Sequence, residues 1–482
     1  MAHNKFLPRM IAAAAAMALL AGCGSKTSDP GFSPSDPVDI TIWTYYNGEQ
    51  LEAFNALVDE FNATVGKEQG ITVESSSHGS VTDLENNVLD SAEGKVGADP
   101  MPNIFSAYAD TAYALDEMEQ IADLSNYLSD DDRAAFIEDY LSEGDFSGTG
   151  SIKILPTAKS TELLFINETD WEPFAAATGA TYDDLATIEG LVSVAERYYE
   201  WTDAQTPDIP NDGRAFFGRD AMANYMLIGA KQLGCTIFDA QNGKMTLNFD
   251  HDAVRKLWDN YYVPFIKGYF SASGRFRSDD VKTGNIIAYV GSSSSATFFP
   301  TQVIADDMDS HEITRKVLES PKFSGGEDYA VQQGAGMVVT KASDAEIQAS
   351  LVFLKWFTSP EHNITFSVDS GYLPVTREGN SIDAIRASGL TISDEIDEVL
   401  SAAVDTVNEN HLYTPRAFSG GTDARAILEY AMSDKASADR ATVQSLMDGG
   451  QSFEDASAQF LSDECFEAWY QDTLTALQAY AG

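Results

Sequence analysis

Aromatic rings and small hydroxyl groups gather where the predicted strands end, and this combination suits the binding of a small molecule. Trp43, Tyr45 and Tyr46 close the first predicted strand. Later strands are followed by further polar side chains, namely His78-Gly79-Ser80, Ser106 with Tyr108 and Asp110, Lys159 to Glu162, and Ser292 to Ser295. Flat rings cover the CH-rich faces of sugars, while hydroxyls and amides fix the orientation of such a ligand. The pattern predicts a mostly apolar cleft with a few polar groups.

Each of these residues also has a structural interpretation. An aromatic residue at a strand end packs into a core more often than it stacks on a ligand. The serines from Ser292 to Ser295 could cap a helix instead of contacting a ligand. Arg219 and Asp220 could form a structural ion pair or contact a sugar hydroxyl. The sequence leaves both interpretations open at each position.

The hydrophobic pattern that must position these side chains alternates between strand and helix periods. Residues 38–42 alternate apolar and polar, residues 51–61 repeat at helical spacing, and residues 71–73 return to period two, as in a βαβ unit. Further strands are predicted at 104–105, 152–155, 163–166, 286–290 and 337–339. This order predicts an α/β fold with mainly parallel sheets, in which ligands bind outside the carboxyl ends of the strands.

Three local signals refine this pattern. Asn242-Gly243 between two apolar stretches predicts a hairpin within 238–249. Ser343 and Glu346 stand at the spacing of a capping box for a helix over 343–358, and Pro360 is expected to end it. From Ser393 onward helical periodicity dominates, so the C-terminal part is predicted to be rich in helices.

The N-terminus has the pattern of a secretory signal peptide. Lys5 and Arg9 precede a run of eleven apolar residues, which is too short for the roughly 20 that cross a bilayer. Leu20-Ala21-Gly22-Cys23 resembles a bacterial lipobox, which implies cleavage after residue 22 and acylation of Cys23. The alternative is a plain secretory signal with a chance cysteine. Residues 24–37 are small, polar or proline and predict a flexible linker, so 23–37 form an anchor and linker.

Composition limits the remaining possibilities. The chain has 75 acidic and 30 basic residues, and removal of residues 1–22 takes the formal charge from −45 to −47. So acidic a protein is not expected to bind nucleic acid or anionic headgroups. Its 482 residues favour more than one hydrophobic core. Cys235 and Cys465 are the remaining cysteines; the sequence does not say whether they pair, and no motif indicates a metal or another cofactor.

An extracellular enzyme, such as a glycoside hydrolase, is the rival class. It would need two carboxyl groups in one cleft, but with 75 acidic residues a chance pair is always available. His311-Glu312 is followed by Arg315 where a zinc-protease motif has histidine, and neither a G-x-S-x-G nor a phosphate-binding loop is present. A structural surface lipoprotein or adhesin seldom needs the α/β crossover pattern. The sequence therefore predicts a binding protein without catalytic residues.

A larger set of motifs resembles the family 1 extracellular solute-binding proteins of ABC importers. Besides the lipobox, the matching segments are Ile40-Thr41-Ile42-Trp43, Met101-Pro102-Asn103-Ile104, Pro156 with Lys159-Ser160-Thr161-Glu162 and Phe165-Ile166-Asn167, Gln333-Gly334-Ala335-Gly336, Phe353 to Glu361, and Gly371-Tyr372-Leu373-Pro374-Val375. They span residues 38–376 in the family's order.

The resemblance implies a two-lobed periplasmic-binding-protein-like fold of type II whose lobes close over a ligand. Lobe 1 would comprise 38–157 and 337–366, and lobe 2 would comprise 158–336 and 367–482, with hinge crossings near 158–167, 332–336 and 366–372. The implied ligand is a sugar or oligosaccharide. The implied partners are membrane permease subunits and, through them, a cytoplasmic ATPase. The protein would act as a monomer on the extracellular face of the membrane, anchored through Cys23.

Matching the motifs assigns ligand contacts to Tyr45, Ser80, Tyr108, Ser160, Gly334 and Tyr372, with Trp43 or Tyr46 as alternatives to Tyr45. Glu162, Arg219 and Ser292 complete the predicted site. Arg425, beyond Arg416 to Gly421, resembles the phosphate-binding arginine of members that bind glycerol phosphate. Arginine suits a phosphate, yet a net charge of −47 repels anions at long range. The prediction is a neutral sugar, with glycerol 3-phosphate or another phosphorylated polyol as the alternative.

Overall fold

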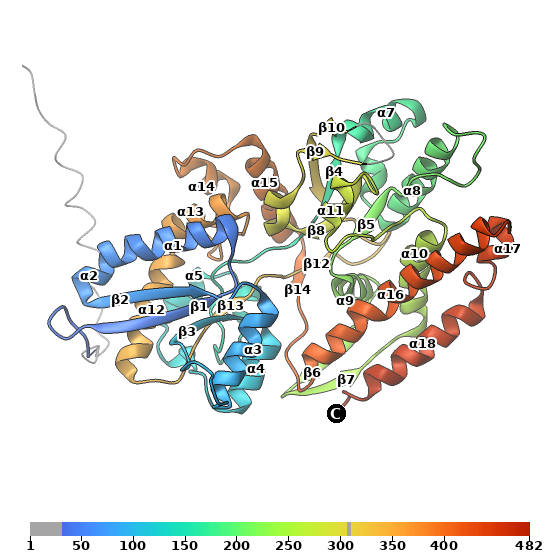
Figure 1. Cartoon of the computed structure of the whole chain (residues 1–482). Coiled ribbons are helices and arrows are strands. Elements are labelled where there is room, and N and C mark those ends of the chain that lie inside the picture. Colours follow the sequence, from blue (N-terminus) through green and yellow to red (C-terminus); the bar gives the residue numbers. More distant parts are fainter. Residues whose placement is uncertain (1–30, 306–309) are drawn as a thin grey trace, which may run out of the picture.

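The computed structural model describes residues 31–305 and 310–482, and these form two bodies side by side (Figure 1). The predicted signal peptide, Cys23 and residues 24–30 of the predicted linker lie outside the described residues. The first body contains a four-stranded sheet in the order β13 (Gly336–Val339), β3 (Ile104–Ala107), β1 (Val38–Thr44), β2 (Ile71–Ser77). Strand β1 pairs in parallel with β2 and β3, whereas β13 is antiparallel to β3.

Helices cover the first sheet, and aromatic residues fill the space between them. These helices are α1 (Gly48–Ala63), α2 (Val65–Gln69), α3 (Val81–Ala92), α4 (Ala109–Glu117), α5 (Asp130–Ala135), α6 (Glu138–Ser142), α12 (Asp344–Phe357) and α13 (Pro360–Ser370). Phe54 of α1 is fully buried and its ring contacts the rings of Tyr46, Phe357 and Phe366. Helix α1 therefore forms because its apolar residues recur on one face that the core covers.

The second body contains a mixed sheet in the order β11 (Arg315–Glu319), β4 (Glu162–Asn167), β8 (Ala288–Ser292), β5 (Phe217–Arg219). Strand β4 is antiparallel to both neighbours, and only β5 and β8 pair in parallel. The prediction of mainly parallel sheets is therefore wrong for this body. An unbroken apolar run indicates burial on both faces, which is typical of parallel strands, but it does not encode direction.

The burial pattern of β4 explains this error. Leu164 and Ile166 lie in the core of the second body, while Leu163 and Phe165 point to a core shared with the first body. All four side chains are fully buried. An antiparallel strand between two cores thus carries the same apolar sequence as a central parallel strand.

Most of the second body is helical. Its helices are α7 (Glu168–Thr178), α8 (Ile188–Asp203), α9 (Met222–Gln232), α10 (His251–Ile266), α11 (Arg277–Lys282), α16 (Gly421–Asp448), α17 (Phe453–Ser457) and α18 (Asp463–Gln478). Helix α15 (Asp394–Glu409), which follows α14 (Ile382–Ala387), packs against β4 and β11. Short strand pairs are β6 (Phe238–Gln241) with β7 (Lys244–Leu247), β9 (Gln302–Val303) with β10 (His311–Glu312), and β12 (Tyr329–Val331) with β14 (His411–Tyr413).

The local predictions have mixed outcomes. The hairpin is confirmed, with Asn242 and Gly243 at positive φ between β6 and β7. The capping box of α12 is confirmed as well, because Glu346 N–H donates to Ser343 Oγ at 3.3 Å and Ser343 N–H donates back to Glu346 Oε2 at 3.0 Å. Pro360 begins α13 in addition to following α12. Residues 152–155 are not a strand, since only Leu155 forms a single bridge, to Met337.

Three chain segments that run between the bodies meet in one place. Lys159 N–H donates to the Leu373 carbonyl at 3.2 Å, and Ser160 and Gln333 exchange backbone hydrogen bonds of 3.0 and 2.9 Å. Gly334 has φ +87°, and a Cβ there would lie 2.6 Å from the carbonyl oxygen of Ala158. The segments therefore approach so closely that position 334 has room for glycine alone.

A buried ion pair lies at this meeting point. Lys159 is fully buried, and its ammonium contacts the Glu143 carboxylate and donates to the Gly334 carbonyl at 2.7 Å. Gln332 Nε2 donates to the same carboxylate at 3.1 Å. One lysine thus connects the first crossing, the second crossing and α6 of the first body.

Two further observations concern the described residues as a whole. Cys235 and Cys465 are both free, so they do not form a disulfide. Within 31–305 and 310–482, we find no helix with the length and apolar character needed to span a membrane.

The buried ion pair leads to a stability prediction. Lys159→Met leaves the Glu143 carboxylate buried without its cation, so the free energy of unfolding should fall by about 3–5 kcal/mol in chemical denaturation. Adding Glu143→Gln removes the orphaned charge and should recover much of the loss. The control is Lys153→Met, because the Lys153–Asp116 pair at 2.8 Å is partly exposed and should cost about 0–1 kcal/mol. Equal losses in both single variants would contradict the assignment.

Candidate functional site

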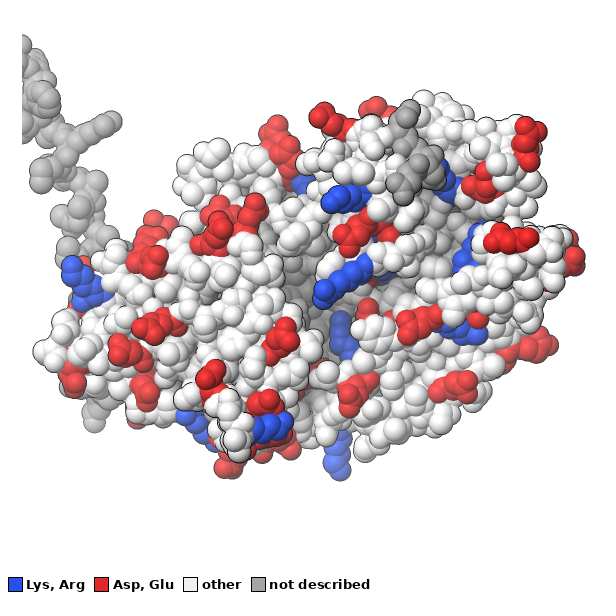
Figure 2. All heavy atoms as spheres, in the orientation of Figure 1, with Lys and Arg blue, Asp and Glu red and all other residues white. Residues whose placement is uncertain are grey.

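A cavity of about 370 Å³ lies between the two bodies, within the range of small-molecule sites. Its first-body wall is formed by Val81 and Glu85 of α3, Tyr108 to Asp110 at the start of α4, and Glu143 after α6. Its opposite wall consists of Ala221, Leu227, Phe238, Gln332, Gln333, Thr414, Pro415, Phe418, Gly421, Thr422 and Arg425. In Figure 2 the surface is hollowed between the bodies. A second cavity of about 400 Å³ adjoins the first and shares Glu143, Phe238 and Gln332 with it.

Tyr108 and Arg425 are the predicted site residues that line this cavity. Tyr108 follows β3 and its side chain is partly exposed. Arg425 lies one turn into α16, and its guanidinium donates to Asn224 Oδ1. Because the segment before α16 folds back against the first body, residues more than 300 positions apart face each other here.

A chain of hydrogen bonds behind Arg425 holds its guanidinium in place. Asn224 Nδ2 donates to Glu162 Oε1 at 2.8 Å, and the other Glu162 oxygen accepts from Arg219. Arg219 in turn lies over the Tyr225 ring, 5.4 Å from its centroid. Burial raises the pKa of Glu162, and the charge of Arg219 opposes this rise. Glu162 and Arg219 also line a small cavity of about 30 Å³ in the second body.

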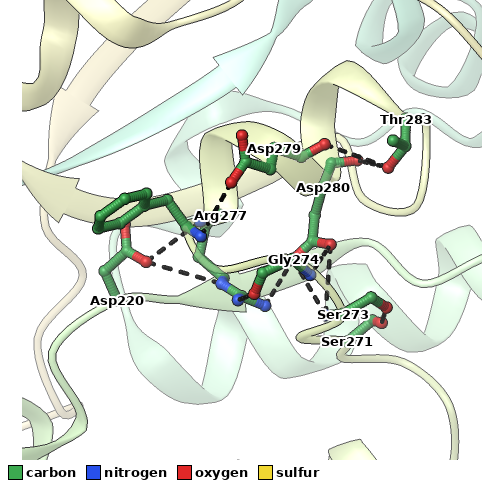
Figure 3. A network of polar contacts seen from close by, with 9 residues as sticks. Asp220, Ser271, Ser273, Gly274, Arg277, Asp279, Asp280 and Thr283 are labelled. Atoms are coloured by element: carbon green, nitrogen blue, oxygen red, sulfur yellow. Dashed lines mark hydrogen bonds and ion pairs between the residues drawn. The ribbon is translucent and has the colours of Figure 1, made fainter.

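Asp220 has a different partner from its sequence neighbour. Arg277 lies between two carboxylates, with Asp280 at 2.5 Å from Nη1 and Asp220 at 3.6 Å from Nε (Figure 3). The backbone N–H of Arg277 donates to Asp220 Oδ1 at 3.1 Å, and the backbone N–H of Gly274 donates to Asp280 Oδ1 at 2.7 Å. Arg219 and Asp220 therefore both form ion pairs, but not with each other. Arg219 pairs with Glu162, and Asp220 pairs with Arg277.

Four predicted residues form a network of hydroxyl groups near the crossings. The Tyr45 and Tyr372 hydroxyls are 3.3 Å apart, and Tyr372 also contacts Ser294. Ser292 Oγ lies 2.9 Å from Ser294 Oγ and donates to Ser160 Oγ at 3.1 Å. Burial raises the pKa of Tyr45 and Tyr372, so both phenols stay protonated at neutral pH. The network extends from the end of β1 to the end of β8.

The remaining predicted residues pack in a core, cap helices or lie at a crossing between the bodies. Trp43 is 8% exposed and its ring lies 4.4 Å from His78 in the core of the first body. Ser80 caps α3, because its Oγ accepts from Asp83 N–H at 3.1 Å. Ser292 caps a short 3-10 helix (Ser293–Phe298), as the alternative for this run proposed, and also belongs to the hydroxyl network. Gly334 lies at the second crossing, next to Gln333 of the cavity wall.

Sequence reasoning missed several residues that shape the cavity. Glu429 of α16 accepts the N–H groups of Met222 and Ala223 at 3.1 and 2.8 Å and so caps α9. Ala221, which precedes α9, has φ +47°, an unusual value for a residue with a Cβ. Asn224 and Glu429 carry no local motif, since their partners lie about 60 to 200 positions away. In the described ranges, no group of His, Cys, Asp or Glu is arranged to hold a metal ion.

Comparison with known proteins identifies the family. A model for bacterial extracellular solute-binding proteins matches residues 56–387, which is more than half of the chain. The chain belongs to this family. It is therefore a binding protein and not an enzyme, and it acts outside the cytoplasm. No curated protein sequence matches the chain significantly.

Solved structures with the same fold include sugar-binding proteins. The cyclic α-maltosyl-1,6-maltose binding protein of Arthrobacter globiformis has a TM-score of 0.66 and 17% identity, covering 92% of this chain and all of that one. UgpB of Mycobacterium tuberculosis in complex with glycerophosphocholine has a TM-score of 0.63 and 16% identity, covering 92% and 98%. The Listeria monocytogenes protein Lmo0181 with cycloalternan has a TM-score of 0.63 and 15% identity, covering 92% and 100%. These likenesses confirm the two-lobed binding-protein fold.

The Arg277 cluster leads to a prediction about pH. Burial raises the pKa of Asp220 from 3.8 to about 6, because its ionised form is desolvated. Between these values the folded protein binds a proton that the unfolded chain does not, so this group's cost to stability declines as the pH falls below 6 and is lost only near pH 3.8. Asp220→Asn should therefore stabilise the protein by up to about 3 kcal/mol at pH 7.5, and by about 1.4 kcal/mol less than that at pH 5.

The control for this prediction is a variant whose stability should change in the opposite direction. Hydrogen bonds from Ser343 hold the pKa of Glu346 below its usual value, so Glu346→Gln should lower stability at pH 7.5. Chemical denaturation of both variants and the parent at pH 5 and 7.5 measures these differences. A variant Asp220→Asn that is less stable than the parent at pH 7.5 would contradict the argument.

Proposed function

We propose that this protein captures a neutral sugar or oligosaccharide between two lobes and delivers it to the permease of an ABC importer. The observation that carries the proposal is the cavity between the bodies, with Tyr108, Phe238 and Phe418 as apolar surfaces and Gln333 and Arg425 as polar ones. Aromatic faces with a few oriented polar groups match the amphipathic surface of a sugar. Structural neighbours that bind maltose-type sugars and cycloalternan support the ligand class.

The charges around the cavity favour a neutral ligand over a phosphorylated one. Glu162 pairs with Arg219, Glu143 pairs with Lys159, and Glu429 occupies the N-terminus of α9. A helix N-terminus and an arginine are the usual anion sites, and here Glu429 already occupies the N-terminus of α9 and Glu162 already pairs with Arg219. A phosphate would have to approach a wall that also carries Glu85 and Asp110.

A phosphorylated polyol such as glycerol 3-phosphate is the second candidate. Its support is Arg425, which lines the cavity and pairs with no carboxylate within salt-bridge distance among the described residues. The relative from Mycobacterium tuberculosis, which binds glycerophosphocholine, adds weight to this alternative.

We propose that the two bodies act as the two lobes. We assign 38–157 and 337–366 to lobe 1, and 158–336 and 367–482 to lobe 2, with the hinge at the hydrogen-bonded crossings around Lys159, Gln333 and Leu373. Hinge closure about such crossings covers a bound ligand, and the closed form is the one that the permease would accept. The protein is proposed to act as a monomer.

Lys5 and Arg9, the apolar run and the lipobox support secretion and a lipid anchor at Cys23. The anchor would hold the protein at the extracellular face of the membrane, near its permease. The predicted linker over 24–37 is too long, because Phe32 is buried in the core of the first body. A shorter linker over 24–30 would let the lobes move while the effective concentration at the permease stays high.

A ligand screen tests the function. Neutral oligosaccharides and glycerol 3-phosphate are added to the protein and thermal unfolding is followed, since a ligand at 100 times its Kd adds about 2.7 kcal/mol. Tyr108→Ala should weaken binding of the sugar at least tenfold, because the loss of ring stacking costs about 1.5 kcal/mol. Tyr430→Ala is the control, as Tyr430 is 59% exposed on α16. A response to glycerol 3-phosphate alone, abolished by Arg425→Met, would replace the sugar proposal by the alternative.

A second prediction concerns the anchor. Replacing Cys23 by Ala removes the acylation site, so the protein should move from the membrane fraction to the medium or the soluble fraction. Fractionation with immunoblotting measures this, and Cys465→Ala is the control because Cys465 lies in the folded domain. Membrane attachment that persists in the Cys23 variant would rule out lipidation there.

A further inference from the structure

Asp110 connects the two bodies at the edge of the cavity. It is the second residue of α4 in the first body, and its carboxylate accepts the N–H of Phe418 in the segment before α16. A Cβ on Gly421 would lie only 2.3 Å from Asp110 Oδ1, so the carboxylate lies directly against the first turn of α16. Because α4 and α16 belong to different bodies, this contact exists only while the bodies are together.

The surroundings of this contact are also shared between the bodies. The hydroxyl of Tyr113, one turn along α4, lies against Gly243 of the β6–β7 hairpin, where a Cβ would be only 1.9 Å away from it. Gly243 forms a backbone bridge with Phe418, and Ala417 is buried in a core cluster with Phe105 of β3. The start of α4 is therefore a surface on which the second body closes.

The groups that face Asp110 come from four elements. Glu85 of α3 and Glu143 after α6 repel its negative charge, while Arg425 of α16 attracts it and the Phe418 N–H stabilises it. The positive end of the α16 dipole also favours the ionised form. Burial outweighs these attractions and raises the pKa of Asp110 to about 6. The pKa of neighbouring Glu85 is likewise raised by burial, despite a 2.8 Å hydrogen bond from Thr111.

We propose that closure of the cleft takes up a proton at Asp110, so that mild acid favours the closed arrangement of the lobes. The inference rests on the hinge closure of the proposed function. In the open form Asp110 leaves Phe418 and Gly421 and becomes hydrated, which returns the pKa of its carboxyl to the ordinary range for aspartate. In the closed form a neutral carboxyl still accepts the Phe418 N–H and no longer repels Glu85 and Glu143.

The size of the effect follows from proton linkage. A carboxyl that titrates near 6 when closed and near 3.8 when open binds more protons in the closed state between these values. Lowering the pH from 7.5 to 5 should then shift the equilibrium between the open and closed forms about tenfold toward the closed form. Above pH 7 the carboxylate is ionised in both states and the effect levels off.

Single-molecule fluorescence transfer counts open and closed molecules directly. Val96→Cys in the first body and Ile209→Cys in the second, both at exposed positions, carry the dyes in the ligand-free chain with serine at the three native cysteines. We expect the ratio of closed to open molecules to rise about tenfold between pH 7.5 and 5. In Asp110→Asn, which mimics the neutral acid, this ratio should be high at both pH values.

The control and the contradicting outcomes are equally direct. Asp131→Asn removes an exposed carboxylate of α5 and should respond to pH like the parent. A parent ratio that stays constant or falls on acidification, or a full pH response in Asp110→Asn, would overturn the inference. Because no ligand is present, these outcomes leave the sugar proposal untouched. A failed ligand screen would in turn leave the pH response of the lobes as measured.

Discussion

The contact of Lys159 with Glu143 is the interaction on which the rest of the structure depends. A fully buried lysine is tolerated only when a carboxylate and further acceptors replace its water, and here Glu143 and the Gly334 carbonyl do so. The same ammonium therefore ties the first crossing to the second crossing and to the end of α6. Glu143 and Gln332, which this cluster joins, both line the cavity between the bodies.

Around the cavity, most charges are compensated within the protein although the chain as a whole is strongly acidic. Arg219 and Glu162 neutralise each other, Glu429 caps α9, and Asn224 orients the guanidinium of Arg425. The first-body wall differs, because burial raises the pKa of Glu85 and Asp110 there, and the charge of Arg425 offsets the burial of Asp110 only in part. Bringing the bodies together thus has an electrostatic cost on one wall, which a proton or the donor groups of a bound ligand can relieve.

The accuracy of the sequence predictions depended on how local each signal is. The capping box of α12 and the Asn242-Gly243 turn were predicted correctly because the residues that stabilise them are three or fewer positions apart. The direction of β4 was predicted wrongly, because its apolar run reports burial by two cores and not the orientation of its neighbours. The strand prediction for residues 152–155 was wrong for a related reason, since a short apolar run does not say whether the edge of a sheet is available for pairing.

The site shows the same division between local and distant information. Sequence alone determined the family motifs, the order of the β and α units, and Tyr108 and Arg425 as residues that line the cavity. It also determined the acidic composition and the segment Leu20-Ala21-Gly22-Cys23 that resembles a lipobox, which are properties of the chain before folding. Only the tertiary structure decided that Asn224 and Glu429 support the cavity wall, that Arg219 pairs with Glu162, and that Asp110 meets α16. The physical reason is that these contacts join segments about 60 to 300 residues apart, and no local pattern of side chains records which distant surface will be buried against which.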